Sequence, residues 1–321
     1  MKIKWYLLTA GTLQEQPDPT TWPMADLRQM GESWFDIQEA VPDELQSFLT
    51  PLNLHPLLLD RALAPANAPG VVSHDRAALL EFPAALDRAA RDRAYLTLVV
   101  QGPVLVTIRP GPMPALDDLV HHLVAEKAPD LRHLPQILYE ILDCLADLHA
   151  GAEIEARDQI RRLAKMLTEN PGAVSASELA NLSGRIEGLV SLLEDQLYCI
   201  TGLTASDAEA LKEPHRRAYL QDLQSEAEIA QRGIYRLESR MKDLYDYYQM
   251  AGSDRVEKRL RILTIISAIS LPLALVTGIF GMNVGGLPAT TFRHGFAVVM
   301  GVMAVIAAAE LWYFIRHRWF D

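Results

Sequence analysis

The residues best suited to handle a metal ion stand at the end of a long apolar run. No charged residue lies between Ile262 and Phe280, and the run is followed directly by Gly281, Met282 and Asn283. The carboxamide of Asn283 and the backbone carbonyl of Gly281 are neutral oxygens, which can hold the water shell of a small divalent cation without removing it. A ring of these groups would therefore form an ion filter. The alternative is that Asn283 only ends a helix, a position at which asparagine is favoured.

A second feature is a stripe of residues along the same run. Counting back from the glycine in helical steps places the stripe on Gly278, Ala274, Leu271, Ser267, Leu263 and Leu260. If this face lines a pore, its small residues lie outside and its leucines inside, where leucine rings would form a hydrophobic gate that closes by losing its water. The alternative is that the stripe packs one helix against another, as in any membrane bundle.

Two carboxylates upstream of this run form a third candidate. Asp222 and Asp246 lie in the segment that leads into it. Carboxylates that face each other across an interface repel unless a cation lies between them. The two aspartates are therefore a candidate regulatory metal site, and the alternative is that both are solvated on an exposed helix.

Other titratable residues give different predictions. Glu310 is an acid in the second apolar segment, where an ionisable group is often functional. Because the basic C-terminal tail is close, we expect its side chain to reach the inner membrane interface or to pair with an arginine of a neighbour. His121, His122 and His294 have no second ligand at metal-binding spacing, so they are expected to be surface histidines.

Composition argues against several classes of protein. The 321 residues are 50% hydrophobic and 22% charged, and the formal net charge is −11. This acidic balance argues against nucleic-acid binding and permits an interior that attracts cations. The sequence has no phosphate-binding loop, nucleophile elbow or paired catalytic carboxylates. Neither an enzyme nor a protein with an organic cofactor is therefore expected.

The apolar residues gather near the C-terminus, in runs over 262–280 and 295–309. Each is close to the roughly 20 residues that a membrane-spanning helix needs. Basic residues flank the pair on one side, namely Arg255, Lys258, Arg259, Arg261, Arg316, His317 and Arg318. Because such charges stay in the cytoplasm, both termini are expected there, with the two spans in the inner (plasma) membrane and a short external loop between them.

The rest of the chain must position these groups. Short strands and helices mix near the N-terminus: 1–14 is expected as a first strand, 42–48 and 55–62 as helices, and 95–100 with 104–108 as a hairpin. A helix from Pro135 ends at Asn170-Pro171-Gly172, and a capping box at Ser175–Glu178 opens the next. A third helix begins near Pro214 and meets no terminator before Gly281.

These signals predict an α/β cytoplasmic domain followed by a long stalk helix and two C-terminal transmembrane helices. The expected segments are an α/β domain (1–133), a helical hairpin region (134–213), the stalk (214–260), a pore-lining transmembrane helix (261–283), an external loop (284–294), a second transmembrane helix (295–315) and a basic cytoplasmic tail (316–321).

The Gly281-Met282-Asn283 tripeptide, placed at the end of the first span, resembles the signature of the CorA superfamily of divalent metal cation transporters. The resemblance extends over the whole chain through segments such as Leu271-Pro272-Leu273, Ala218–Leu223, Trp34–Ile37 and Val106–Arg109. It implies a homopentameric funnel in the lipid bilayer, with Gly281, Met282 and Asn283 as selectivity filter and Asp222 in a regulatory cation site between identical subunits.

The external loop bears on the transported ion. Magnesium-transporting members commonly have an acidic residue there, whereas the segment 284–294 has none and includes Arg293. Its Gly285-Gly286-Leu287-Pro288 run resembles the zinc-transporting ZntB branch. Zn²⁺ and Mg²⁺ are therefore both candidate substrates, with Co²⁺ and Ni²⁺ as further ones. The rival function is a membrane-anchored oligomeric scaffold or signalling protein without transport.

Overall fold

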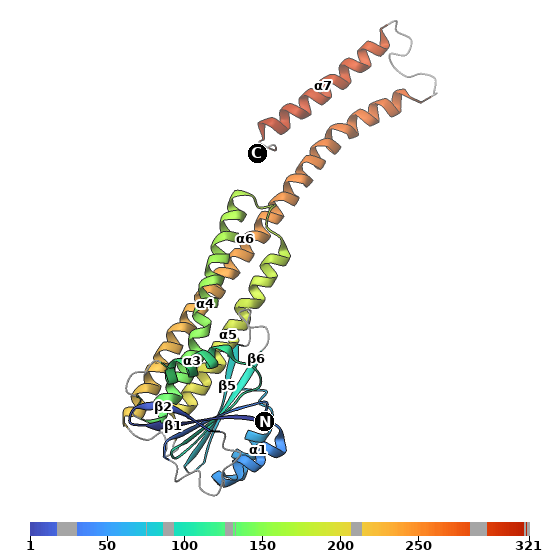
Figure 1. The fold of residues 1–321 in the computed structure, drawn as a ribbon. Coiled ribbons are helices and arrows are strands. Elements are labelled where there is room, and N and C mark those ends of the chain that lie inside the picture. Colours follow the sequence, from blue (N-terminus) through green and yellow to red (C-terminus); the bar gives the residue numbers. More distant parts are fainter. Residues whose placement is uncertain are drawn as a thin grey trace. The chain divides into compact units, whose positions relative to one another are not determined.

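The computed structural model describes residues 1–17, 31–74, 76–85, 93–125, 131, 133–206, 214–282, 294–317 and 319. These residues form two compact units, Met1–Leu244 and Tyr245–Asp321. The long helix α6 (Pro214–Phe280) contributes to both units (Figure 1).

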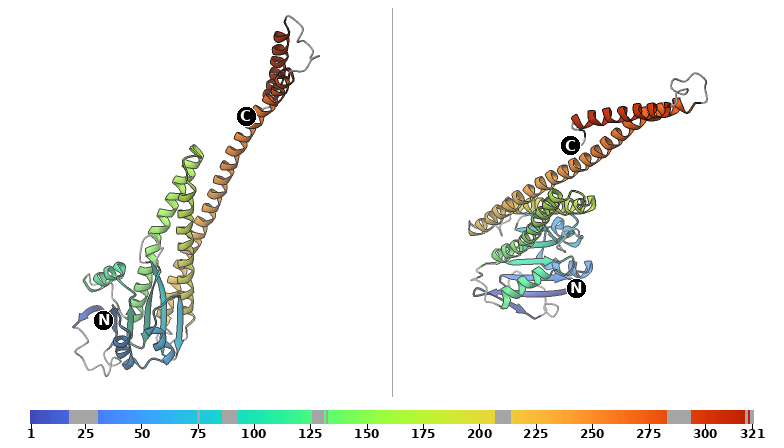
Figure 2. Two further views of the ribbon diagram at one scale, coloured as in Figure 1. Left: turned by 90° about the vertical axis from the view of Figure 1, so that its right-hand side faces the viewer. Right: turned by 90° about the horizontal axis from the view of Figure 1, so that it is seen from above.

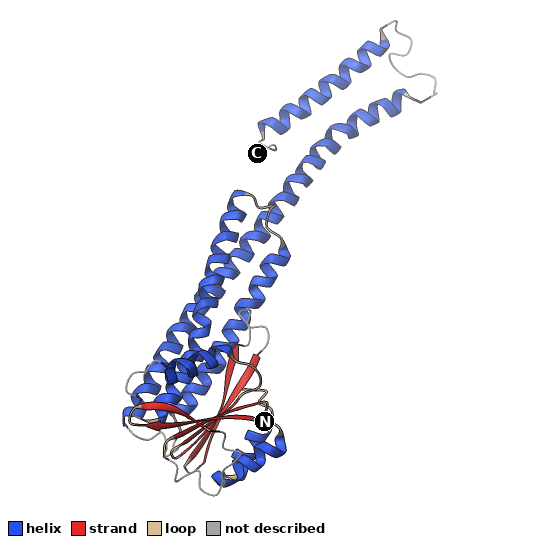
Figure 3. Cartoon of the chain, in the orientation of Figure 1, coloured by secondary structure: helices blue, strands red, loops and turns tan. Residues whose placement is uncertain are grey.

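A seven-stranded sheet organises the described part of the first unit (Figure 3). Its strand order is β2-β1-β3-β7-β6-β5-β4, and all neighbours are antiparallel except β3 and β7, which are parallel. The strands are β1 (Lys2–Thr9), β2 (Thr12–Gln16), β3 (Ser33–Gln38), β4 (Gly70–His74), β5 (Ala77–Ala85), β6 (Arg93–Gln101) and β7 (Val104–Ile108). The predicted hairpin is confirmed as β6 and β7, which pair Gln101 with Val104.

The N-terminal segment differs from the single strand that was predicted. It folds as the two strands β1 and β2, which reverse at Ala10 and Gly11. Both turn residues have positive φ, 50° and 82°, as in the mirror-image turns whose twist matches that of antiparallel strands. Glycine adopts this backbone at little cost, so Gly11 was the local signal for the turn.

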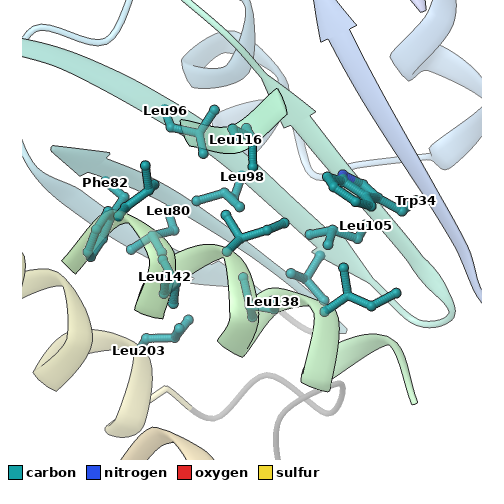
Figure 4. Close-up of a cluster of buried hydrophobic side chains, with 14 of the residues drawn as sticks. Trp34, Leu80, Phe82, Leu96, Leu98, Leu105, Leu116, Leu138, Leu142 and Leu203 are labelled. Atoms are coloured by element: carbon teal, nitrogen blue, oxygen red, sulfur yellow. The ribbon is translucent and has the colours of Figure 1, made fainter. Parts of the chain in front are cut away.

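Helices cover both faces of the sheet, because alternate strand residues point to opposite sides. Leu79 lies in one buried cluster with the helices α1 and α2, and Leu80 lies in another with α3, α4, α5 and the start of α6. Figure 4 shows the second cluster, in which Leu80 and Phe82 face Leu142 and Leu203. The helices are α1 (Pro42–Leu49), the 3-10 turn η3 (Thr50–Leu52), α2 (Pro56–Leu63), α3 (Pro114–Ala125), α4 (Leu134–Glu169) and α5 (Ala176–Thr204).

A buried ion pair joins the two parallel strands. Arg109, directly after β7, donates to Asp36 of β3 from Nε at 2.8 Å and from Nη2 at 2.7 Å. Asp36 also accepts the Thr107 hydroxyl at 2.7 Å, and Trp34 Nε1 donates to Thr107 at 3.2 Å. A third nitrogen of Arg109 reaches Asp117 on α3 at 2.8 Å. The network therefore fixes β3, β7 and α3 to one another.

The predicted helical hairpin is present as α4 and α5, which lie side by side with the first part of α6 (Figure 2). The capping box at the start of α5 is formed: Ser175 Oγ accepts from Glu178 N at 3.2 Å, and the Glu178 carboxylate accepts from Ser175 N at 3.2 Å. Arg185 Nη1 of α5 donates to Gln159 Oε1 of α4 at 3.0 Å, which joins the two antiparallel helices.

The second unit consists of the last part of α6 and the helix α7 (Gly295–Arg316), which run in opposite directions (Figures 1 and 2). Ile265 of α6 and Phe314 of α7 are buried in this unit. Both helices are long and apolar enough to cross a membrane. The predicted third helix is confirmed from Pro214 to Phe280, with Pro272 inside it.

Candidate functional site

The predicted filter begins where α6 ends. The Gly281 amide donates to Thr277 O at 2.8 Å and the Met282 amide to Ile279 O at 3.3 Å, so two of the last carbonyls of the helix are satisfied by the residues that follow it. A Cβ on Gly281 would lie 3.0 Å from Thr277 O, which favours glycine here. The Met282 side chain is 56% exposed. Asn283 and residues 284–293 lie outside the described residues.

The predicted pore stripe is exposed along its whole length in the single chain. Leu260, Leu263 and Leu271 are 57%, 59% and 75% exposed, and the smaller residues Ser267, Ala274 and Gly278 are exposed as well. These side chains are apolar or small, and the described part of the chain does not cover them. They are therefore available to a pore or to other copies of the chain.

The stripe also lies on a particular side of α6. Residues of a helix turn by about 100° each, so Leu263 and Ser267, each two positions from Ile265, lie about 160° around the helix from it. Ile265 is 5% exposed and marks the buried face of α6 in this unit. Leu263 and Ser267 thus lie on the face of α6 opposite to its buried residue, whereas Leu260, at the inner end of the stripe, lines a cavity with His317 and Trp319.

Two threonine hydroxyls near the stripe bond to the backbone of α6 itself. Thr264 Oγ1 donates to Leu260 O at 2.8 Å, and Thr277 Oγ1 donates to Leu273 O at 3.1 Å. Such bonds to the preceding turn hold threonine side chains against their own backbone. The Ser267 hydroxyl is the polar side chain of the stripe itself.

The two predicted regulatory carboxylates are separated by the fold. Asp222 is exposed in the first unit and accepts the Tyr139 hydroxyl of α4 at 3.3 Å, while Asp246 is exposed in the second unit. A single chain does not bring them together. Among the residues that the structure describes, no group of three or more His, Cys, Asp or Glu side chains has the arrangement of a metal site.

Carboxylates that were not predicted lie near Asp222. Burial raises the pKa of Asp143 to about 6, helped by the charges of Asp147 and Glu226 and by a hydrogen bond with Glu226. That hydrogen bond joins α4 to α6 through two carboxyl groups, which requires a shared proton. Burial also raises the pKa of Tyr139, with contributions from Asp143, Glu226 and Asp222. The signal in the sequence was the spacing of acids along one face of α4.

Of the remaining candidate residues, the three histidines are exposed and Glu310 is half-buried. His121 and His122 on α3 are exposed, as is His294 at the start of α7. Glu310 Oε2, in contrast, is buried and has no hydrogen-bond partner among the described residues.

Comparison with known proteins places this arrangement in a family. The model of the CorA-like Mg²⁺ transporter protein family matches residues 31–316. The chain is 22% identical to the putative metal ion transporter YfjQ of Bacillus subtilis, covering 93% of this chain and 94% of the relative. It is 27% identical to the divalent cation transporter CmaX of Pseudomonas aeruginosa (91% and 92%) and 25% identical to the zinc transport protein ZntB of Cronobacter sakazakii (89% and 87%).

Solved structures agree on the fold. The CorA magnesium transporter of Methanocaldococcus jannaschii superposes with a TM-score of 0.81 at 17% identity, covering 98% of both chains. Full-length CmaX gives a TM-score of 0.79 at 22% identity, covering 98% of this chain and 97% of the other. The predicted fold class is thereby confirmed.

The family match spans both units, from β3 to the end of α7. It confirms the resemblance seen in the sequence and the expectation that the chain is not an enzyme. The chain belongs to the CorA-like Mg²⁺ transporter family and is a divalent cation transporter.

Proposed function

We propose that identical copies of this chain, five as the family resemblance implies, assemble into a funnel that passes Zn²⁺ or Mg²⁺ through a central pore lined by α6. The observation that supports this assembly is the position of the stripe. The stripe is exposed in the single chain, and Leu263 and Ser267 lie opposite the buried Ile265, so a ring of α6 helices with α7 outside would turn the stripe inward. Symmetric rings of identical subunits are the usual way to close such an interface.

The ring would present different groups at different depths. Gly281, Met282 and Asn283 would stand at the outer mouth, where neutral oxygens bind the hydration shell of the ion. Leu263 and Leu260 would form the inner constriction, which is closed when it is dry. Because a hydrated Mg²⁺ loses water reluctantly, this filter would select for charge and size of the hydrated ion.

The proposed membrane placement follows from the basic residues at the inner ends of the spans. Segments 261–283 and 295–315 would cross the inner membrane, with residues 284–294 outside and both termini in the cytoplasm. The cytoplasmic part would then comprise the α/β domain (1–133), the helical hairpin region (134–213), the stalk (214–260) and the basic tail (316–321).

A regulatory role for Asp222 and Asp246 is part of the proposal. Each is exposed on α6, where it would face a neighbouring subunit in the ring. A divalent cation held between subunits would neutralise the facing carboxylates and stabilise the closed funnel. Loss of that cation would restore the repulsion and favour opening.

The choice between zinc and magnesium rests on the external loop. The segment 284–294 has no acidic residue and carries Arg293, so no local negative charge concentrates cations there. The loop resembles the ZntB branch, which favours Zn²⁺ as the substrate. Co²⁺ and Ni²⁺ are candidate substrates through the same pore.

Flux measurements test the proposal against the rival scaffold function. Purified protein in liposomes should admit divalent cations, and Asn283→Ala should abolish or strongly reduce this flux. Thr290→Ala, a polar-to-alanine change in the external loop, is the matched control and should leave flux nearly unchanged. Absence of flux above that of empty liposomes would favour the scaffold. Comparing Zn²⁺, Mg²⁺, Co²⁺ and Ni²⁺ in the same vesicles identifies the substrate.

A further inference from the structure

A cavity of about 420 Å³ opens at the inner end of the two-helix unit. It is lined by Glu257, Leu260, Arg261, Thr264, His317 and Trp319. Four of these come from one face of α6 and two follow the end of α7. Cavities of this size are within the range of roughly 300 to 1,000 Å³ that holds small ligands.

The position of the cavity along α6 defines its surroundings. Arg261 is the last charged residue before the apolar run that begins at Ile262, and His317 directly follows α7. The cavity therefore lies where the chain passes from charged to apolar. A ligand there would contact charged groups at one end and apolar side chains at the other. These surroundings suit an amphiphilic ligand.

The charged groups favour an anion. Of the ionisable residues that line the cavity, Arg261 and His317 are bases and Glu257 is an acid. Arg261 donates from Nη2 to Glu257 at 3.0 Å, which fixes its guanidinium while its other N–H groups stay available to a ligand. The Glu257 side chain is 69% exposed and the Arg261 side chain is 32% exposed, so water screens the acid more than the base.

Aromatic side chains hold the other wall in place. Trp319 packs on Phe314 with ring centroids 5.2 Å apart, and its amide donates to Phe314 O at 3.1 Å. His317 lies on Tyr313 at 4.5 Å between centroids, and the Arg316 guanidinium lies 5.3 Å from the Trp312 ring. Tryptophan and tyrosine are the residues that sit at the headgroup level of a membrane.

We propose that this cavity binds the phosphate headgroup of an anionic phospholipid of the inner leaflet. Arg261 and His317 would donate to the phosphate, and Trp319 would flank the start of the acyl chains. The inference rests on the proposed membrane placement of α6 and α7. A soluble phosphate shares the headgroup chemistry, but it would leave the apolar wall of the cavity uncovered.

Lipid quenching of tryptophan fluorescence tests this inference. The full-length protein is placed in phosphatidylcholine liposomes that contain a rising fraction of phosphatidylglycerol with acyl chains brominated near the glycerol. Brominated phosphatidylcholine serves as the reference lipid, and Trp319→Phe identifies the emission of Trp319. We expect brominated phosphatidylglycerol to quench Trp319 at a several-fold lower fraction than the reference lipid.

Paired variants separate the cavity from general surface charge. Arg261→Gln should weaken the preference for phosphatidylglycerol about fivefold, the effect of one basic residue near an anionic membrane surface. Arg259→Gln is the matched control: it makes the same change two positions away, at a residue that is exposed and does not line the cavity, and should keep the preference. His317→Gln is a second test if Arg261→Gln fails to insert. Glu257→Gln should strengthen the preference.

Three results would overturn the inference. Equal quenching by both lipids would show that the cavity does not recognise the headgroup. An equal loss in Arg259→Gln and Arg261→Gln would assign the preference to diffuse charge. Relief of quenching by millimolar inorganic phosphate would make the cavity a site for soluble anions. If neither lipid quenches Trp319, the proposed membrane placement itself is wrong, which distinguishes that failure from the loss of lipid selectivity alone.

Discussion

The buried ion pair between Asp36 and Arg109 gives the sharpest prediction about stability. The Asp36 and Arg109 side chains are 0% and 1% exposed, and two hydrogen bonds of 2.7 and 2.8 Å join them. Asp36→Asn keeps the shape and removes the charge, so the guanidinium remains buried with Asp117 as its other carboxylate. Removing one partner of a buried pair costs about 3 to 5 kcal/mol. Asp36→Asn should therefore lower the free energy of unfolding of the sheet by that amount.

A matched substitution isolates burial as the cause. Asp117 also pairs with Arg109, at 2.8 Å, but its side chain is 50% exposed. Exposed pairs contribute about 0 to 1 kcal/mol, so Asp117→Asn should cost no more than that. The double variant Asp36→Asn/Arg109→Met should recover part of the loss, because it removes the uncompensated charge.

Hydrogen exchange of the full-length protein measures these effects locally. Peptides that cover β3 and β7 report the free energy of opening of the two parallel strands. Protection should fall strongly in Asp36→Asn and little in Asp117→Asn. If the two variants lose the same protection, or if Asp36→Asn loses less than about 1 kcal/mol, burial does not decide the strength of this pair.

Three further predictions follow from other sites. Leu263→Ser should wet the constriction and raise basal cation flux in liposomes, and unchanged or reduced flux in a correctly assembled protein would identify the stripe as packing only. Burial and the neighbouring acids raise the pKa of Asp143 to about 6, so the folded protein loses stability as the pH rises from about 4 to 6 and this carboxyl group ionises. Asp143→Asn removes that ionisation and should raise the thermal midpoint more at pH 7.5 than at pH 5. Equal increases at the two pH values would contradict a proton shared by Asp143 and Glu226. Gly70→Ala would place a methyl group against the ion pair of Arg61 and Glu81 and lower the free energy of unfolding by about 1 to 3 kcal/mol, which thermal unfolding measures. An unchanged thermal midpoint would show that the two side chains move aside freely.

Local patterns predicted the helices well because their signals are local. The capping box at Ser175 and the proline at Pro214 mark helix starts by chemistry that acts within a few residues. The stripe on α6 was also predictable, since helical spacing alone decides which residues share a face. The structure adds that Leu263 and Ser267 lie opposite the buried Ile265, which no property of α6 alone determines.

Contacts between residues that are far apart in sequence could not be predicted from local patterns. The parallel neighbours β3 and β7 are separated in sequence by most of the α/β domain, and no short turn between them indicates that they pair. Asp36 and Arg109 were noticed as parts of family-like segments, but their ion pair depends on that strand pairing. The carboxyl pair of Asp143 and Glu226 likewise depends on how α4 packs against α6. The helix α3 was missed although Leu116, Leu119, Val120 and Leu123 have the i, i+3, i+4, i+7 spacing of an amphipathic helix, a local signal that the sequence does carry.

The central claim is that the exposed stripe of α6 lines the path of the ion, and thiol accessibility tests it most directly. After replacement of Cys144 and Cys199, a single cysteine is introduced at Leu263, on the stripe, or at Ile262 beside it. The two native side chains are similarly exposed in the single chain, 59% and 56%, but point about 100° apart around the helix. A charged, water-soluble thiosulfonate should reduce divalent cation flux through Leu263→Cys and leave Ile262→Cys unaffected. Equal modification of both, or block of Ile262→Cys alone, would contradict a pore lined by this stripe.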